Sequence, residues 1–199
     1  CKISGFSSIE GVRGKGLQFE DGTWFINDYF QVPGATAANG MPCGDQPVTY
    51  SLWVKPATSF DGQVHMGNGP VYLLRRGVWG DGTQSVIWLL SGPKVVWSIA
   101  NWEFGGANSV VAECPDLLDQ KWHQIVCTYE NRCFKLYYDG KLTNVLEQTG
   151  NVLSIADGSL IQLGANGDDY NSVSQNRYAG GVDELKVYNR ALAADEVTA

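Results

Sequence analysis

Short apolar segments recur about every ten residues along the chain, separated by Gly, Pro, Asn or Asp, and this spacing constrains the fold most strongly. In residues 48–56 (VTYSLWVKP), Leu52 and Val54 alternate with Trp53 and Lys55, as in a half-buried strand. The segments expected to be strands are residues 15–21, 29–33, 48–56, 62–67, 70–76, 85–92, 94–101, 109–115, 121–130, 133–140, 159–166 and 181–188. Strands at this spacing are typical of two packed antiparallel sheets, so the sequence predicts an all-β sandwich.

Residues 121–140 (KWHQIVCTYENRCFKLYYDG) predict one pair of strands directly. Apolar alternation runs up to Tyr129, breaks at residues 130–131 and resumes at Phe134, which is the pattern of a hairpin. The dipeptide 139–140 (Asp-Gly) then predicts a second tight turn, because both residue types readily adopt positive φ.

The length and composition suit one domain that spans residues 1–199. With 44% hydrophobic and 12% aromatic residues, the chain can bury a substantial core. The 24 glycines and 7 prolines are spread along the chain, so they indicate tight turns rather than a linker. Helix is expected only as a single turn near the C-terminus, where Leu192 and Val197 would close one end of the sandwich.

The charge balance argues against several classes of partner. The chain has 21 acidic and 14 basic residues, a formal net charge of −7, and its longest basic cluster is the pair Arg75-Arg76. Phosphate binding needs a concentrated positive face, so no nucleic-acid partner is expected. No apolar run approaches the roughly 18 residues of a membrane-spanning helix, so no membrane span is expected either.

The 5 cysteines are Cys1, Cys43, Cys114, Cys127 and Cys133. They contain no C-x-x-C pair, and the chain has only 2 histidines, so a zinc site is not expected. An odd number of cysteines in a compact acidic β-domain predicts one or two disulfides plus a free thiol, in an oxidising compartment. Cys127 is in phase with core residues and Cys133 is not, so these two are not expected to bridge. The alternative is that several cysteines are buried free thiols.

An ordered set of segments resembles a known family. The segments are VRGKGLQFEDG, DYFQVP, VTYSLWVKPAT, KWHQIVCTYENRCFKLYYDGKL, IQLGANG and YAGGVDELKVYNRAL followed by DEV. Together they resemble the laminin-G-like jelly-roll domain of the concanavalin A-like lectin/glucanase superfamily over almost the whole chain. The resemblance implies a jelly roll of two curved antiparallel sheets. Ala193 stands where the family often has a Ser helix cap, so only Glu196 of a capping box is expected.

Asp183 stands out in residues 181–188 (GVDELKVY), because strict period two places it on the face of Leu185 and Val187, where a carboxylate needs a partner. The family resemblance implies a calcium ion, held by a last-strand carboxylate that matches Asp183. Its other oxygens come from a segment that matches residues 20–22, with Asp21 and Gly22 as ligands. Calcium takes about six to eight oxygens and would tie the two chain ends together. The alternative is that Asp183 accepts main-chain N–H groups from a neighbouring Gly-rich turn.

The acidic residues do not predict catalysis. Enzymes of this superfamily that cut polysaccharides use paired carboxylates on one strand face. The acidic pairs of this chain, at residues 20–21, 168–169, 183–184 and 195–196, are sequence neighbours, so on a strand their side chains diverge to opposite faces. His123 lies within the Trp-His hairpin, where a packing or hydrogen-bonding role is expected. The sequence therefore predicts no enzymatic activity.

The aromatic content indicates a binding surface, because 7 Trp and 9 Tyr exceed what the core needs. Aromatic rings stack on the C–H faces of sugars, while Asp, Asn and Arg bind the hydroxyls. The residues expected to bind a ligand are Arg76, Trp79, Asp81, Asn101, Trp102, Asn166, Asp168 and Tyr170. The alternative is that such aromatics fasten loops to the sandwich.

We therefore expect a non-catalytic, lectin-like carbohydrate-binding module of a secreted or cell-surface protein, stabilised by calcium, with a glycan or polysaccharide as partner. Most of this expectation rests on the family resemblance, because a fold alone does not determine function. The first alternative is an adhesion module that binds a protein. The second is a polysaccharide-cleaving enzyme.

Overall fold

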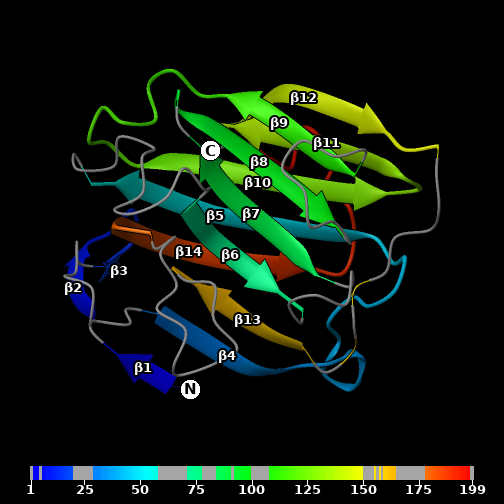
Figure 1. Cartoon of the computed structure of the whole chain (residues 1–199), viewed down its shortest axis with the longest axis horizontal. Coiled ribbons are helices and arrows are strands. Elements are labelled where there is room, and N and C mark those ends of the chain that lie inside the picture. The colour runs from blue at the N-terminus through cyan, green and yellow to red at the C-terminus, as the bar shows by residue number, and fades with distance from the viewer. Residues whose placement is uncertain are drawn as a thin grey trace.

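The computed structural model describes residues 2–4, 6–19, 29–57, 71–77, 84–90, 92–99, 108–149, 155, 157, 159–164 and 178–197. Within these ranges the regular structure is almost entirely strand, apart from one short 3-10 helix, η1 (Ala37–Asn39). The strands form two antiparallel sheets, one behind the other in Figure 1. The predicted all-β sandwich is confirmed.

The first sheet, sheet A, has seven strands in the described residues, in the spatial order β1-β4-β13-β6-β7-β8-β9. Their bounds are β1 (Lys2–Ser4), β4 (Tyr29–Ala35), β6 (Val71–Arg76), β7 (Ser85–Leu90), β8 (Lys94–Ile99), β9 (Ser109–Glu113) and β13 (Ser159–Leu163). Strands β6 to β9 are successive neighbours joined as a meander, whereas β13 inserts between β4 and β6. In Figure 1 this sheet lies nearer to the viewer.

The second sheet, sheet B, also has seven strands in the described part of the chain, in the order β12-β11-β10-β5-β14-β3-β2. Their bounds are β2 (Phe6–Glu10), β3 (Lys15–Phe19), β5 (Val48–Pro56), β10 (His123–Glu130), β11 (Cys133–Tyr138), β12 (Lys141–Glu147) and β14 (Gly180–Tyr188). The last strand, β14, lies between β5 and the N-terminal strand β3, so the two ends of the chain meet in this sheet.

The core lies between the sheets and contains aromatic side chains from both. Trp97 of sheet A is fully buried, and its ring centroid lies 6.2 Å from that of Tyr50 and 5.1 Å from that of Phe134, both in sheet B. Both contacts are edge-to-face, the arrangement that aromatic quadrupoles favour. Leu52 and Val54 are fully buried as predicted, so the alternation in β5 fixes which face of sheet B points inward.

The two predicted turns of sheet B are present. Asn131 and Arg132 have φ of 49° and 64° and close the β10–β11 hairpin. Asp139 and Gly140 have φ of 47° and 74° and join β11 to β12. Two successive positive φ values are typical of the tight turns that match the twist of paired strands.

The C-terminal segment packs on the outer face of sheet B, the face that points away from sheet A. Leu192 and Val197 form a small apolar cluster there with Val126 of β10 and Tyr137 of β11. Residues 194–196 form a turn rather than a helix. No helix in the described ranges combines the length and the apolar composition that crossing a lipid bilayer requires.

Candidate functional site

Most residues predicted to bind a ligand or a metal lie outside the residues that the structure describes. These residues are Asp21, Gly22, Trp79, Asp81, Asn101, Trp102, Asn166, Asp168 and Tyr170. The predicted loop cluster and the N-terminal calcium ligands therefore stay predictions. Two of the predicted residues, Arg76 and Asp183, belong to the described strands.

Arg76 lies at the end of β6 with its side chain fully buried. Its guanidinium donates to the main-chain carbonyl oxygens of Pro42 and, at 3.3 Å, of Ala35, and one nitrogen lies 3.2 Å from the Cys43 sulfur. These contacts tie β6 to the segment that follows β4. The guanidinium is therefore held inside the fold and is committed to main-chain carbonyl groups.

Strand β14 contains a β-bulge directly after Asp183, which pairs with Trp53 of β5 before the register shifts. Glu184 in the bulge has φ of 49°, in the left-handed region. The extra residue reverses the alternation, so Leu185 and Val187 pack against the core while Asp183 shares the outer face with Trp53. The period-two interpretation, which placed Asp183 on the face of Leu185 and Val187, is wrong because of this bulge.

Asp183 is nevertheless buried, with 9% of its surface exposed. One carboxylate oxygen accepts the main-chain N–H of Arg13 at 3.2 Å, and the other accepts that of Glu184 at 2.8 Å. A Cβ atom at Gly11 would lie 2.3 Å from Asp183 Oδ2, so the close approach requires glycine. Gly11 and Arg13 belong to the turn between β2 and β3, so the carboxylate fastens the last strand to the N-terminal hairpin.

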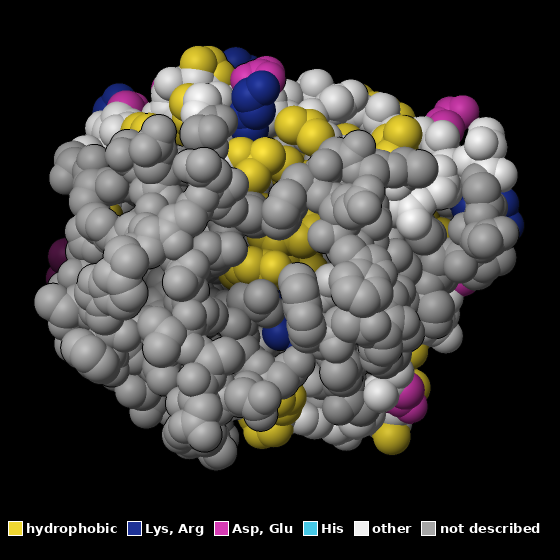
Figure 2. Space-filling view, viewed as in Figure 1, with side chains coloured by type: hydrophobic (Ala, Val, Ile, Leu, Met, Phe, Trp, Pro, Cys, Tyr) yellow, Lys and Arg dark blue, Asp and Glu magenta, His cyan; other side chains and the backbone are white. Residues whose placement is uncertain are grey.

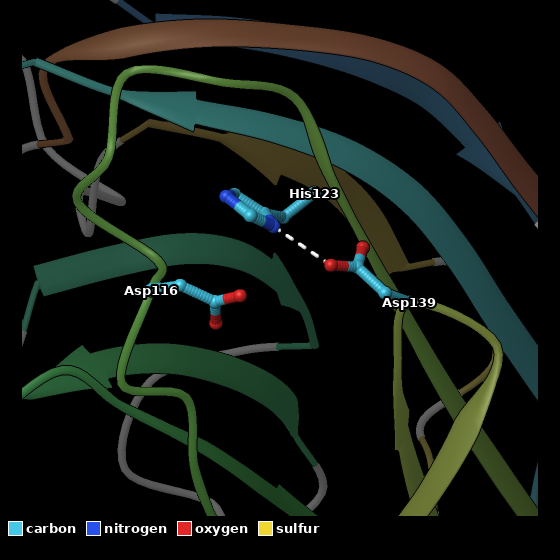
Figure 3. A group of neighbouring side chains, drawn as sticks. All are labelled: Asp116, His123 and Asp139. Atoms are coloured by element: carbon cyan, nitrogen blue, oxygen red, sulfur yellow. Dashed lines mark hydrogen bonds and ion pairs between the residues drawn. The ribbon is translucent and has the colours of Figure 1, made fainter.

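A second group of carboxylates, which the sequence interpretation missed, surrounds His123 at the start of β10 (Figure 3). His123 Nδ1 lies 2.8 Å from Asp139 Oδ2, and Nε2 lies 2.9 Å from Asp119 Oδ1. Asp116 points toward the pair from the preceding loop, and one ligand atom each of Asp116, His123 and Asp139 lie within 4.8 Å of one another. The other oxygen of Asp139 accepts the main-chain N–H of Gln124 at 2.7 Å.

The register of the β10–β11 hairpin could have predicted that Asp139 lies close to His123. Counting outward from the turn pairs Ile125 with Tyr138, so the next step brings Gln124 opposite Asp139 and places His123 beside it. Asp119 carries no comparable signal, because the loop before β10 brings it to the ring.

The electrostatics of the group favour a protonated imidazole. Burial by itself would lower the pKa of His123, but hydrogen bonds to Asp139 and Asp119 outweigh it, so the pKa is raised. Hydrogen bonds from Lys121 and His123 hold the pKa of Asp119 far below its usual value. With both ring N–H groups donated to carboxylates, the imidazolium joins the loop before β10 to the turn after β11.

The ligand types of Asp116, His123 and Asp139 are those of a transition-metal site. However, both ring nitrogens already contact a carboxylate, and a metal ion on either nitrogen would displace one of those contacts. The arrangement is therefore that of a charged cross-link.

Cys43, Cys114, Cys127 and Cys133 are free thiols, so the predicted disulfides are absent among the described cysteines. Burial raises the pKa of Cys114 to about 12 and that of Cys127 well above its ordinary value. Such thiols are unreactive, because the thiolate is the nucleophile. The alternative interpretation of buried free thiols describes these two residues.

A groove of about 300 Å³ lies on the outer face of sheet B. Trp53 of β5, Gln124 of β10 and Lys186 of β14 lie on its floor, because they alternate with core residues along their strands. The β2–β3 turn forms one wall and the C-terminal segment with Leu192 forms the other. This face is turned away from the viewer in Figure 1.

The outer face of sheet A carries a separate aromatic cluster. Tyr72 of β6 and Trp88 of β7 lie directly opposite each other, with ring centroids 6.0 Å apart. Val86 and Val96 complete the cluster. Figure 2 shows hydrophobic side chains near the centre of this face of the molecule.

The two antiparallel sheets, closed by a last strand that inserts between β5 and β3, define a jelly-roll β-sandwich of the concanavalin A-like type. Residues 21–198 match the laminin G family model described as the concanavalin A-like lectin/glucanases superfamily. The chain belongs to this superfamily. A comparison with curated protein sequences finds no match.

Solved structures with a similar fold include modules of larger bacterial proteins. Domain 4 of the extracellular GH43 arabinanase AbnA from Geobacillus stearothermophilus, in complex with arabinotriose, has a TM-score of 0.63 at 19% identity, covering 97% of this chain and 79% of that domain. The CBM40 module of the Ruminococcus gnavus IT-sialidase, bound to α2,3-sialyllactose, has a TM-score of 0.60 at 16% identity, covering 92% and 93%.

The binding domain of Paraclostridial Mosquitocidal Protein 1 has a TM-score of 0.66 at 17% identity, over 98% of this chain. This chain spans only 45% of that domain. At such identities these likenesses show the fold alone.

Proposed function

We propose that this protein is a non-catalytic, lectin-like carbohydrate-binding module that acts outside the cell or at its surface. The observation that carries the proposal is the match of residues 21–198 to a superfamily of lectins and glucanases. Two modules of similar fold, from the arabinanase and the sialidase, were solved with a saccharide bound. The module would bind a glycan on a rigid scaffold, with pre-positioned aromatic rings and polar side chains.

The carboxylates near His123 favour a lectin over a glucanase. Glycosidases need one carboxyl group whose pKa is raised, so that it can protonate the leaving oxygen. Here the pKa of Asp119 is lowered instead, and Asp119 and Asp139 both contact the His123 ring. These two groups are committed to a cross-link within the fold.

The loop residues predicted from the sequence remain part of the proposal. Trp79 and Trp102 would stack on sugar rings, while Asp81 and Asn101 would bind hydroxyl groups. Asn166, Asp168 and Tyr170 would extend the same site from a third loop.

We also propose a structural calcium ion at Asp183. A carboxylate is the right ligand type, but Asp183 supplies at most two of the about six to eight oxygens that calcium binds. Asp21 and Gly22 would have to supply others. If the ion is present, EDTA lowers the melting temperature of the wild type and leaves Asp183→Asn unchanged. An unmoved transition, with no calcium found by elemental analysis, removes the ion from the proposal.

A glycan array with and without EDTA, combined with release assays on common polysaccharides, tests the proposed function. We expect binding to a saccharide without product release. Product release would make the protein an enzyme, and Asp139→Asn would then show whether the His123 group performs the reaction. Complete absence of glycan binding would contradict the proposal and favour a protein ligand.

A further inference from the structure

We propose that the groove on the outer face of sheet B is a saccharide subsite, in which a sugar ring stacks on Trp53 and a sugar hydroxyl donates to the side-chain oxygen of Gln124. This inference rests on the proposed function and assigns a place to it. Trp53 and Gln124 are not among the loop residues that the sequence indicated, nor among the side chains that surround His123.

The first observation is an unsatisfied acceptor beneath the groove. Gln124 lines the groove with 9% of its surface exposed, and its side-chain oxygen is buried with no hydrogen-bond partner in the described structure. An unpaired buried acceptor costs about 1–3 kcal/mol. The last side-chain torsion of Gln is broad, so the amide can rotate at little cost. A ligand that donates an O–H bond would relieve the cost.

The second observation is the aromatic surface beside that oxygen. Trp53 lies directly opposite Gln124 in the β5–β10 pairing and is half-buried, so part of its indole remains uncovered at the groove. Tyr188 of β14 also lines the groove and is half-buried. A saccharide is the ligand class that presents an apolar C–H face and hydroxyl donors on one small ring.

The charged side chains around the groove largely neutralise one another. Lys186 pairs with Glu184 at 2.7 Å, and Glu196 of the C-terminal wall pairs with Arg190 at 2.6 Å. Arg13 of the other wall adds guanidinium donors that suit ring and hydroxyl oxygens. These contacts favour a hydroxyl-rich ligand over a strongly charged one.

Both walls of the groove are fixed before any ligand arrives. Asp183 holds the β2–β3 turn through the Arg13 N–H, and Leu192 and Val197 anchor the C-terminal segment to Val126. The volume of about 300 Å³ is at the lower end of small-ligand sites, so the groove suits a short saccharide unit. A preformed site keeps the entropic cost of binding low.

Gln124→Met gives the sharpest test, because it separates binding from folding. The substitution removes the unpaired oxygen at nearly constant shape, so the melting temperature should stay the same or rise. Affinity should fall about tenfold, as expected for a lost hydrogen bond to a hydroxyl. The matched control is Gln18→Met on β3, which is not among the groove-lining residues and should bind like the wild type.

Calorimetric titrations should use arabinotriose, α2,3-sialyllactose and the saccharide with the strongest glycan-array signal. Trp53→Ala should abolish measurable binding, and Trp53→Phe, which keeps a ring, should restore part of it. A crystal structure of the complex should place a sugar ring on Trp53.

Three outcomes would overturn the subsite. If Gln124→Met and Trp53→Ala bind the array saccharide as tightly as the wild type, the subsite is absent while the proposed function stands. If the complex shows an ordered water at Gln124 and the sugar elsewhere, the groove is only hydrated. If the wild type binds no saccharide, the proposed function fails together with the subsite.

Discussion

Asp183 in β14 and Asp139 in the turn after β11 are both aspartates of the sheet B region, and the protein satisfies them in different ways. Asp183 accepts two main-chain N–H groups, from Arg13 and Glu184. Asp139 accepts one main-chain N–H, from Gln124, and one N–H of the His123 ring. The first carboxylate is held by neutral donors, whereas the second belongs to a group of titrating side chains.

The two aspartates therefore connect segments of the fold in two different ways. A bulge and a tight turn position the main-chain donors next to Asp183, so the Asp183 contact depends on backbone geometry. The donors next to Asp139 include an imidazole with a raised pKa, so that contact depends on the protonation of His123. Substitutions should therefore affect the two carboxylates differently.

The largest expected effect is that of Asp183→Ala. The substitution leaves the N–H groups of Arg13 and Glu184 without their acceptor and should lower the free energy of unfolding by about 2–3 kcal/mol. Urea unfolding measures the change. Asp183→Asn keeps one acceptor oxygen and should lose less. Equal losses in the two variants would show that the charge, rather than the hydrogen bonds, holds the closure.

Gly11→Ala tests the same closure from the opposite side. A Cβ atom at this position would lie 2.3 Å from Asp183 Oδ2 and 2.9 Å from the main-chain nitrogen of Gly16. Overpacking of this kind should cost about 1–3 kcal/mol. In the Asp183→Ala background the cost should shrink, because the nearer atom is gone, and a double-mutant cycle measures the difference. Additive losses would mean that Gly11 is needed only for the approach to Gly16.

The contrast also shows what the sequence could and could not predict. Strands inside the sheets were found, because apolar alternation marks a face that neighbours bury. Strands β1, β2 and β12 were missed, and all three are edge strands. In β12, exposed residues such as Leu142 and Val145 follow no buried face, so no alternation identifies the strand. The predicted strand at residues 62–67 lies outside the described residues.

The candidate site was harder to predict than the fold. The sequence singled out Asp183 but placed it on the wrong face, because a one-residue bulge is invisible to a period-two pattern. The His123 group was missed because Asp116 and Asp119 reach it from a loop, and only Asp139 follows from hairpin counting.

The stability that the His123 cross-link contributes should depend on pH. The folded pKa of His123 is raised above the unfolded value of about 6.5, so its stabilisation is complete below that pH and is lost as pH rises through the folded pKa. The melting temperature should therefore fall as pH rises from 6 to 8. His123→Gln should flatten this dependence, whereas Asp183→Asn should retain it.

The melting experiment should not extend above about pH 8, because the cysteines then begin to affect stability. Burial raises the pKa of the Cys114 and Cys127 thiols, so above about pH 8.5 the unfolded chain ionises them more easily and stability falls for that separate reason. A melting temperature that is constant from pH 6 to pH 8 in the wild type would show that the His123 cross-link contributes no pH-dependent stability.

The smallest expected effect is that of Glu196→Gln. Glu196 is an exposed carboxylate that contacts both a charged side chain and a main-chain N–H. Glu196 pairs with Arg190 and also accepts the main-chain N–H of Ala193 at 2.9 Å, which is the surviving half of the capping box. The hydrogen bond from Arg190, followed by that from Ala193, lowers the pKa of Glu196 to about 2. The stabilisation from Glu196 is therefore complete above the pKa of the unfolded chain and is lost as pH falls through the folded pKa.

Exposed pairs contribute little and are screened by salt, so at pH 7 the melting temperature of Glu196→Gln should differ from that of the wild type by less than about 2 °C. The change should shrink further between about 10 mM and about 500 mM salt, measured by calorimetry. A larger loss that salt does not reduce would contradict this expectation, because the Gln oxygen can still accept the Ala193 N–H and only the exposed ion pair with Arg190 is removed.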